Sequence, residues 1–234
     1  EGLYPVFSAV VHALYPEDSV QFDGENFTPD SRLQMRNTLR AYRSVVDGDA
    51  DLIFCAAPSQ EQLDYAQQKG VELELVPIGQ EAFVFLVNRN NPVDNLTVDQ
   101  VRGIYHGTYH NWQELGGRNA PISALQRLPG SGSQTALLAF MQGQSIAKDY
   151  DSFLGSAIGF SFRYYVSDVI ENGGVKMLAL NGVYPSKENI ASGQYPVVSP
   201  FYAIYQKENP NPNIPKILDW LLSDDGQSMI EQTG

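Results

Sequence analysis

The chain has 234 residues, enough for one large domain or two small ones. It is 43% hydrophobic and 18% charged, a globular composition that buries a substantial core and carries no signature of disorder. With 27 acidic residues against 15 basic ones, it is a poor partner for nucleic acid or an anionic membrane.

The first part of the chain predicts two helices and a strand. A helical stretch ends near Tyr15-Pro16, and residues 31–46 repeat apolar side chains on one helical face. DLIFCAA, residues 51–57, is a continuous apolar run of the kind that is buried on both faces of a parallel sheet. Its Cys55 is the only cysteine, which excludes an internal disulfide and favours a buried, inert thiol.

The alternation of strand and helix then continues. Residues 59–70 predict a polar helix that ends at Gly70, and residues 71–78 and 83–88 predict strands. Thr97 and Gln100 form a capping box that opens a short helix. The rhythm predicts α/β layers with helices covering a mostly parallel sheet.

The second half of the chain repeats this pattern. PISALQR, residues 121–127, predicts a strand that runs into a glycine-rich turn and a helix over 135–141. Strands are expected at 175–180 and 197–206, and an amphipathic helix within 214–230. No run approaches the roughly 20 apolar residues that a membrane helix requires.

The clearest candidate site is RLPGSGSQT, residues 127–135. A Gly/Ser turn that opens a helix presents backbone N–H groups and a positive dipole end, which suit a tetrahedral oxyanion. Ser131 and Ser133 add hydroxyl donors, and Arg127 can add a charge-assisted pair. An ordinary solvent loop with an N-cap serine explains the motif equally well. It matches neither a Walker A loop nor a nucleophile elbow.

Two further stretches carry small or hydroxyl residues. Thr28, Asp30 and Ser31 are good N-caps for the helix expected over 31–46, and capping alone explains them. The functional interpretation is a second helix N-terminus that faces the same anion. The strand end Ala56-Ala57 and Ser59 can line a ligand cleft, or can simply pack.

No pattern points to catalysis or to a metal. His12, His106 and His110 follow no metal spacing, and no paired carboxylates or triad signature stand out. A hydrolase with Ser131 as nucleophile lacks a placed base. Arg163, in an aromatic stretch, favours a structural role.

Several segments, in order, resemble the phosphate-binding proteins of phosphate ABC importers, the PstS-like family. RLPGSGSQT is similar to the family's Arg-x-x-x-Ser-Gly-Thr/Ser phosphate loop. The other similar segments are GLYPVFSAV (2–10), the hinge and second-lobe stretch over 77–117, AIGFSFRYYV (157–166), and the closing helix over 211–227. The ordered series covers most of the chain and is far more specific than any one motif.

The resemblance implies the type II periplasmic-binding-protein fold. This is an α/β fold of two lobes, with two mixed sheets flanked by helices, a ligand cleft between the lobes and hinge closure on binding. The first lobe would comprise residues 1–80 and 195–234, and the second residues 81–194.

The same resemblance implies which residues contact the anion. They are Arg127, Ser131, Gly132 and Ser133 in the phosphate loop, Leu3 and Tyr4 in the first loop partly through backbone N–H groups, and Ser31, or alternatively Thr28, at the start of the second helix.

Two positions depart from the family pattern. The family commonly has an aspartate after the DLIFCAA-type strand, where it accepts a proton from bound phosphate and rejects fully deprotonated anions. Here Ala56-Ala57 offers no carboxylate, and Leu3 replaces a hydroxyl residue of the first loop. Strict selectivity for phosphate over other oxyanions is therefore not expected.

The function implied is a non-enzymatic extracytoplasmic receptor without a cofactor, acting as a monomer, that delivers phosphate or a related oxyanion to an ABC permease. The resemblance also implies a lipid anchor on an N-terminal segment outside this chain, whose sequence starts abruptly at EGLYPVF. The alternative keeps the fold but makes the chain a ligand-sensing or regulatory domain of a membrane-attached protein, with weak or no phosphate binding.

Overall fold

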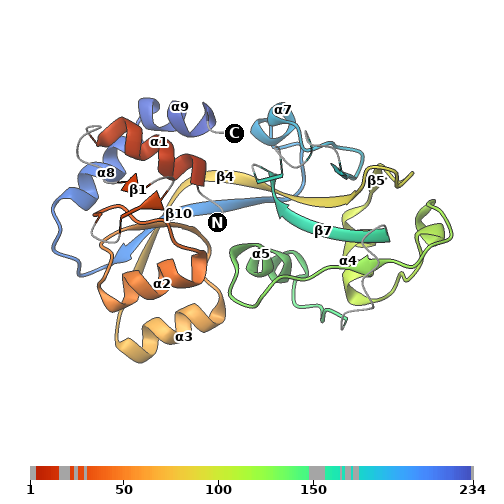
Figure 1. Ribbon diagram of the computed structural model, residues 1–234, viewed down its shortest axis with the longest axis horizontal. Helices are drawn as coiled ribbons and strands as arrows, with labels where there is room; N and C mark the ends of the chain where they lie inside the picture. Colours follow the sequence, from red (N-terminus) through yellow and green to blue (C-terminus); the bar gives the residue numbers. More distant parts are fainter. Residues whose placement is uncertain are drawn as a thin grey trace. The chain divides into compact units, whose positions relative to one another are not determined.

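The computed structural model describes residues 4–15, 22–23, 26–28, 31–147, 156–163, 165–166, 170 and 174–232. Its helices, including the 3-10 helix η2, are α1 (Tyr4–Leu14), α2 (Thr38–Asp47), α3 (Gln60–Lys69), α4 (Val98–His106), η2 (Trp112–Leu115), α5 (Gly132–Phe140), α7 (Lys187–Ala191), α8 (Asn213–Leu221) and α9 (Asp224–Gln232) (Figure 1). Its strands are β1 (Phe22–Asp23), β2 (Asn26–Phe27), β3 (Ile53–Ala56), β4 (Leu73–Asn88), β5 (Asn95–Leu96), β6 (Ser123–Ala124), β7 (Ala157–Phe162), β8 (Val175–Met177), β9 (Ala179–Leu180) and β10 (Val198–Gln206).

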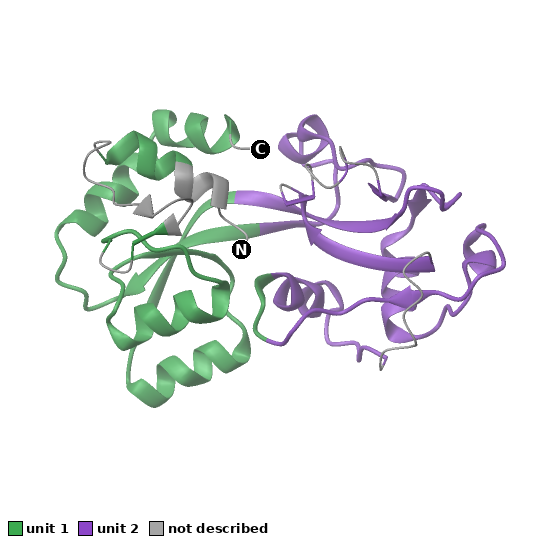
Figure 2. Ribbon diagram, in the orientation of Figure 1, with its two compact units in different colours: residues 1–79, 130–132, 200–234 green, residues 80–129, 133–199 purple. Residues whose placement is uncertain are grey.

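The chain divides into two compact units (Figure 2). Unit 1 comprises residues 1–79, 130–132 and 200–234, and unit 2 comprises residues 80–129 and 133–199. The boundaries fall inside β4 and β10, so these two strands each contribute residues to both units.

The sheet pairings are mixed. The main sheet has the order β3-β10-β4-β7-β6, with β8 beside β4. β3 is antiparallel to β10, and β4 is antiparallel to β7 and β8, whereas β6 with β7 and β5 with β9 are parallel. The α/β class is confirmed, but the expectation of a mostly parallel sheet is wrong. A strand that is covered on both faces has the same apolar sequence pattern whether its neighbouring strand is parallel or antiparallel.

Unit 1 is built in three layers around β3, β10 and the first part of β4. One core cluster joins β4 and β10 to α1, α8 and α9, with Ile78, Phe201 and Leu221 at most 6% exposed. A second cluster joins β3 and β10 to α2 and α3, and includes Tyr42 and Cys55. Cys55 is buried, as expected, and burial raises the pKa of its thiol to about 12, which disfavours the reactive thiolate.

Unit 2 has an aromatic core. Phe83 and Phe85 of β4 are fully buried, and their rings pack at 5.4 Å between centroids in an edge-to-face arrangement. Phe160 and Phe162 of β7 contact Phe83 at 5.5 and 5.7 Å. Tyr105 of α4 and Phe140 of α5 close the cluster against Phe85. Aromatic pairs add to simple area burial, so this cluster fixes α4 and α5 on the sheet.

Most helix boundaries follow the predicted caps. Thr97 and Gln100 form the expected capping box at α4, and Gly70 ends α3 in the left-handed conformation with φ 69°. The second helix is the exception, because it begins at Thr38 with Asn37 as its N-cap rather than at Ser31. Asn37 Oδ1 accepts from Arg40 N at 3.0 Å, and Met35, which precedes the helix, is 40% exposed.

We expect Gly79→Ala to lower the free energy of unfolding by about 1–3 kcal/mol, because overpacking a filled core forces neighbours to move. A Cβ at Gly79 would lie 2.5 Å from Phe201 Cζ and 3.2 Å from Ile230 Cγ2, and both side chains belong to the buried cluster of unit 1. Chemical denaturation measures the effect. Gly159→Ala in β7 is the control, since its Cβ would meet only Leu125 Cδ1 at 3.8 Å. Equal stabilities for the two variants would contradict the packing argument.

Candidate functional site

Residues 127–133, called the 127–133 loop below, follow β6 and include the first two residues of α5. Arg127 and Leu128 are exposed, Leu128 to 82%, and the chain then turns at Pro129-Gly130. Gly130 is buried and has φ 77°, a conformation that side-chain-bearing residues rarely adopt. Proline followed by a left-handed glycine is the pattern of a type II turn. α5 begins directly afterwards, at Gly132, so the turn delivers the chain to a helix N-terminus.

Two buried carboxamides contact the backbone of this loop. Gln134, in the first turn of α5, is 6% exposed, and its Oε1 accepts from Arg127 N at 2.8 Å. Gln62 of α3 is 4% exposed, and its Nε2 donates to Gly130 O at 3.3 Å. The loop therefore makes specific side-chain contacts at its first residue and at its turn. Our sequence interpretation missed both glutamines, although the N3 position of a helix is where Gln commonly reaches back to preceding backbone.

The residues predicted for the phosphate loop lie together. Arg127, Ser131, Gly132 and Ser133 all fall in the 127–133 loop or the first turn of α5, as the spacing of the motif predicts. The N–H groups of the first helical turn have no partners within a helix, and they carry the positive end of its dipole. Backbone donors, two hydroxyls and a guanidinium thus come from one short segment.

Ser31 and Thr28 lie in a turn of their own, before α2. Ser31 N donates to Thr28 O at 2.9 Å, and the Gln34 carboxamide donates to the carbonyls of both residues at 2.9 Å. Ser31 Oγ accepts from Leu33 N at 3.3 Å. The expectation that Ser31 or Thr28 caps the second helix is therefore wrong. Asn, Ser and Thr compete for such positions on nearly equal terms, and here Asn37 holds the cap.

The first loop is described only from its last predicted residue onward. Tyr4 is the first residue of α1, which agrees with the predicted loop-to-helix transition. Leu3 lies outside the described residues.

The carboxyl end of β3 consists of small residues. Tyr42 Oη donates to Ala56 O at 2.7 Å, and burial raises the pKa of this phenol well above its usual range. Ala57 is exposed, and Ser59 then caps α3 in a capping box with Gln62. The strand end thus presents backbone and methyl groups next to a helix N-terminus, without a carboxylate.

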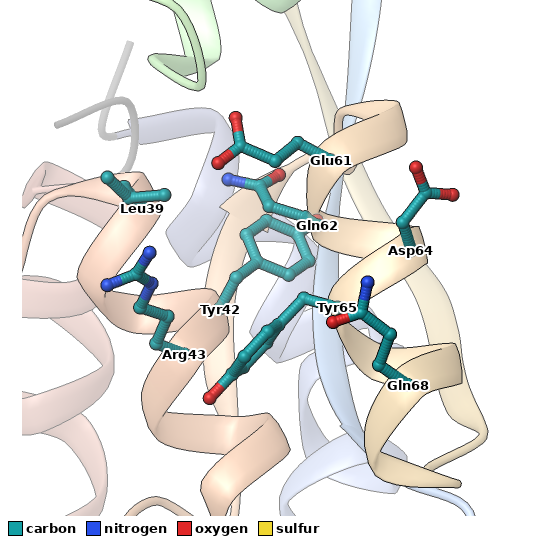
Figure 3. Close-up of a pocket in the computed structure, with 8 residues that line it drawn as sticks. All are labelled: Leu39, Tyr42, Arg43, Glu61, Gln62, Asp64, Tyr65 and Gln68. Atoms are coloured by element: carbon teal, nitrogen blue, oxygen red, sulfur yellow. The ribbon is translucent and has the colours of Figure 1, made fainter.

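The groove between α2 and α3 is a different kind of site (Figure 3). It has a volume of about 290 Å³ and is lined by Leu39, Tyr42, Arg43, Glu61, Gln62, Asp64, Tyr65 and Gln68. Arg43 lies over the Tyr65 ring at 5.8 Å from its centroid, and Tyr65 Oη donates to Asp47 at 2.8 Å. The two carboxylates on its wall disfavour an anion, so we do not assign the oxyanion to this groove.

Arg163 and His106 make structural contacts. Arg163 Nε donates to Pro185 O at 2.8 Å, as expected for a structural arginine, and His106 Nδ1 lies 2.9 Å from Ser145 O. Within the described part of the chain, no three His, Cys, Asp or Glu side chains gather as a metal site would require. The described helices include none with the length and apolar character to cross a bilayer.

Comparison with known proteins identifies the family. Residues 36–225 match the profile of the PBP superfamily domain. The phosphate-binding protein PstS of Bacillus subtilis is 27% identical over 236 residues, covering 95% of this chain and 76% of that protein. PstS of Borreliella burgdorferi is 24% identical over 174 residues, 66% of this chain and 62% of that protein. The chain thus spans less than two thirds of the length of that relative.

The fold has a counterpart among solved structures. A protein named as a phosphate ABC transporter substrate-binding protein, from Clostridium perfringens and with bound phosphate, superimposes with a TM-score of 0.74. The two are 25% identical, and the match covers 99% of this chain and 94% of that one. The resemblance inferred from the sequence and the type II periplasmic-binding-protein fold are both confirmed.

We expect Tyr42→Phe to lower the free energy of unfolding by about 1–2 kcal/mol, because it removes the hydroxyl that pairs the Ala56 carbonyl. Tyr42 is 1% exposed, so water does not readily replace that donor. Tyr184→Phe, at a side chain that is 46% exposed, is the control and should change stability little. Urea titration of both variants measures the difference, and a neutral Tyr42→Phe would disprove the anchoring role of the hydroxyl.

Proposed function

Because the chain belongs to the PBP superfamily, we propose that it is a solute-binding receptor for inorganic phosphate or a related tetrahedral oxyanion. It captures the anion and delivers it to an ABC importer, and it catalyses no reaction. The observation that carries this proposal is the 127–133 loop, which brings an arginine, two serines and a helix N-terminus together. The names of the relatives, phosphate-binding protein PstS and phosphate ABC transporter substrate-binding protein, agree with it.

The loop supplies what a dehydrated oxyanion requires. Backbone N–H groups of residues 131–133 donate hydrogen bonds, the dipole of α5 adds positive potential, and the hydroxyls of Ser131 and Ser133 donate further bonds. The Arg127 guanidinium offers a planar pair of donors that matches two oxygens of the anion. The net charge of −12 does not prevent binding, since a few donors at contact distance outweigh distant, screened charges.

Residues outside this loop would complete the coordination. Tyr4 begins α1, and we propose that the first-turn backbone N–H groups of that helix contribute donors, with Leu3 preceding them. Ser31 and Thr28 would contribute through the turn that Gln34 closes rather than through a helix N-terminus.

The organisation of the receptor follows from the family. We propose that units 1 and 2 act as the two lobes of a binding protein, corresponding to the segments 1–80 with 195–234 and 81–194. The receptor would work outside the cytoplasm as a monomer, held at the membrane by a lipid anchor, and would dock on a permease.

Ala56-Ala57 favours a second candidate function. A carboxylate at this strand end would discriminate between protonated and fully deprotonated anions, and none is present. A domain that senses oxyanions for a membrane-attached protein, with weak or no phosphate binding, is compatible with the same fold. Full-length context separates the two functions, because a lipid-attachment cysteine indicates the receptor and a transmembrane helix followed by signalling domains indicates the sensor.

We expect Arg127→Ala to weaken phosphate binding by about 10- to 100-fold, the loss of one charge-assisted pair. Isothermal titration calorimetry measures the affinity. Arg118→Ala, which removes another exposed arginine of unit 2, is the control for the change in net charge. If both variants bind phosphate as tightly as the parent chain, Arg127 is not a ligand and the site assignment fails.

We expect sulfate, as well as phosphate and arsenate, to raise the melting temperature, because no carboxylate at Ala56-Ala57 repels a fully deprotonated anion. Ala56→Asp places a carboxylate at the last residue of β3 and should abolish the sulfate response while phosphate is retained. Ala56→Asn, equal in size but neutral, is the control. A parent chain that responds to phosphate but not to sulfate would show that selectivity is supplied elsewhere.

A further inference from the structure

Two buried, uncharged side chains form hydrogen bonds with the backbone of the 127–133 loop. Gln134 is 6% exposed and Gln62 is 4% exposed, and a buried carboxamide must pair its polar atoms to avoid a desolvation cost. Part of that pairing goes to the loop: Gln134 accepts from Arg127 N, and Gln62 donates to Gly130 O.

Gln134 connects the start of the loop to the helix that follows it. It is the third residue of α5, and its Oε1 accepts from Arg127 N at 2.8 Å while its Nε2 donates to Gln126 Oε1 at 3.4 Å. The residue that carries the guanidinium is therefore held, through its own backbone, by α5, the helix whose N-terminus would face the proposed anion. This contact fixes the position of the Arg127 backbone, and therefore the point from which its side chain extends.

Gln62 holds the turn. Its Oε1 accepts from Ser59 N at 2.8 Å in the capping box of α3, and its Nε2 donates to Gly130 O at 3.3 Å. One side chain thus caps a helix with its oxygen and orients a peptide group of the loop with its nitrogen. Figure 3 shows Gln62 extending from α3 above the ring of Tyr42. The carbonyl of Gly130 belongs to the same peptide group as Ser131 N–H, so holding one sets the direction of the other.

The stretch between these two contacts has little freedom. Pro129 has a fixed φ, and Gly130 adopts φ 77° in a buried position. A loop held in this way is already ordered before the ligand binds. Preorganised donors bind an anion more tightly than flexible ones, because binding then costs less conformational entropy.

We propose, on the basis of the proposed function, that Gln134 and Gln62 are positioning residues for oxyanion binding, which hold Arg127 and the Gly130-Ser131 peptide group in the binding geometry. They contact the loop and not the anion. They are neutral, so they fix the donors without adding a charge that competes for the ligand.

The test uses neutral substitutions of similar length in the full chain: Gln134→Met, Gln62→Met and, as the matched control, Gln100→Met. Gln100 occupies the same capping-box position in α4 as Gln62 does in α3, so its loss removes a helix cap without touching the loop. Phosphate affinity by calorimetry should fall about tenfold for Gln134→Met and for Gln62→Met, and remain unchanged for Gln100→Met. Equal affinities in all three variants would overturn the proposal.

A second measurement separates positioning from a loss of overall stability. In the absence of phosphate, amide hydrogen exchange at Arg127 should accelerate in Gln134→Met and return toward the parent rate in Gln134→Glu, because a carboxylate oxygen also accepts from Arg127 N–H. Exchange in the core strands β4 and β7 should not change. Uniform acceleration over the whole chain, or no rescue by Gln134→Glu, would contradict a positioning role.

The two proposals fail in different ways. A parent chain that binds no phosphate in calorimetry refutes the proposed function, and the positioning role falls with it. A parent chain that binds phosphate, while Gln134→Met and Gln62→Met bind it equally well, leaves the receptor intact and refutes only the role of the glutamines.

Discussion

Backbone hydrogen bonding along β4 is the constraint on which both units depend. Its 16 residues supply Ile78 to the core of unit 1 and Phe83 and Phe85 to the core of unit 2. The chain passes from one unit to the other between Gly79 and Gln80, where the Phe201 ring fills the space that a side chain at position 79 would need. Glycine at this position is thus a consequence of packing between β4 and β10 and not of a turn.

The position of the 127–133 loop depends on the core of unit 2, because α5, which follows the loop, packs against that core. Phe140, at the end of α5, packs its ring 4.9 Å from Phe85 of β4, and Leu137 is fully buried. A helix anchored in this way has a fixed N-terminus, and Gln134 extends that rigidity backward to Arg127. Backbone N–H groups bind an anion well only when their directions are set in advance, so the aromatic core of unit 2 bears on the chemistry of the loop.

Local signals in the sequence were sufficient for most of the elements. The capping boxes at Ser59 and Thr97 each involve a residue only three positions later, and a glycine in the left-handed conformation ends each of the two helices. Polarity of strand pairing was not predictable, because β3 is apolar on both faces and its partner, β10, lies about 150 residues away along the chain. The start of α2 was misplaced because Thr28, Ser31 and Asn37 are all competent caps, and only tertiary packing selects among them.

The candidate site shows the same division. The position of Arg127, Ser131, Gly132 and Ser133 in a turn and helix start was predictable, since a contiguous motif specifies it, and their role as ligands stays a prediction. Gln134 is the third residue of α5, a position from which Gln commonly bonds back to the N-cap, but no sequence signal indicates a bond to a residue seven positions earlier. Gln62 was out of reach, because its partner Gly130 is 68 residues away and the interaction depends on the fold of unit 1.

Discrimination between protonated and fully deprotonated anions in such a site depends on hydrogen-bond acceptors, since phosphate and sulfate can both accept hydrogen bonds from the same donors. Arg127, the serine hydroxyls and the α5 N-terminus all favour a negatively charged ligand, and none of them distinguishes a protonated anion from a deprotonated one. Only an acceptor that the anion must donate to can distinguish a protonated phosphate from sulfate, and the end of β3 offers methyl groups and a carbonyl already paired with Tyr42. In the proposed receptor, the loop would therefore set the chemical class of the ligand, and the residues at 56 and 57 would set how strictly the site selects one member of that class.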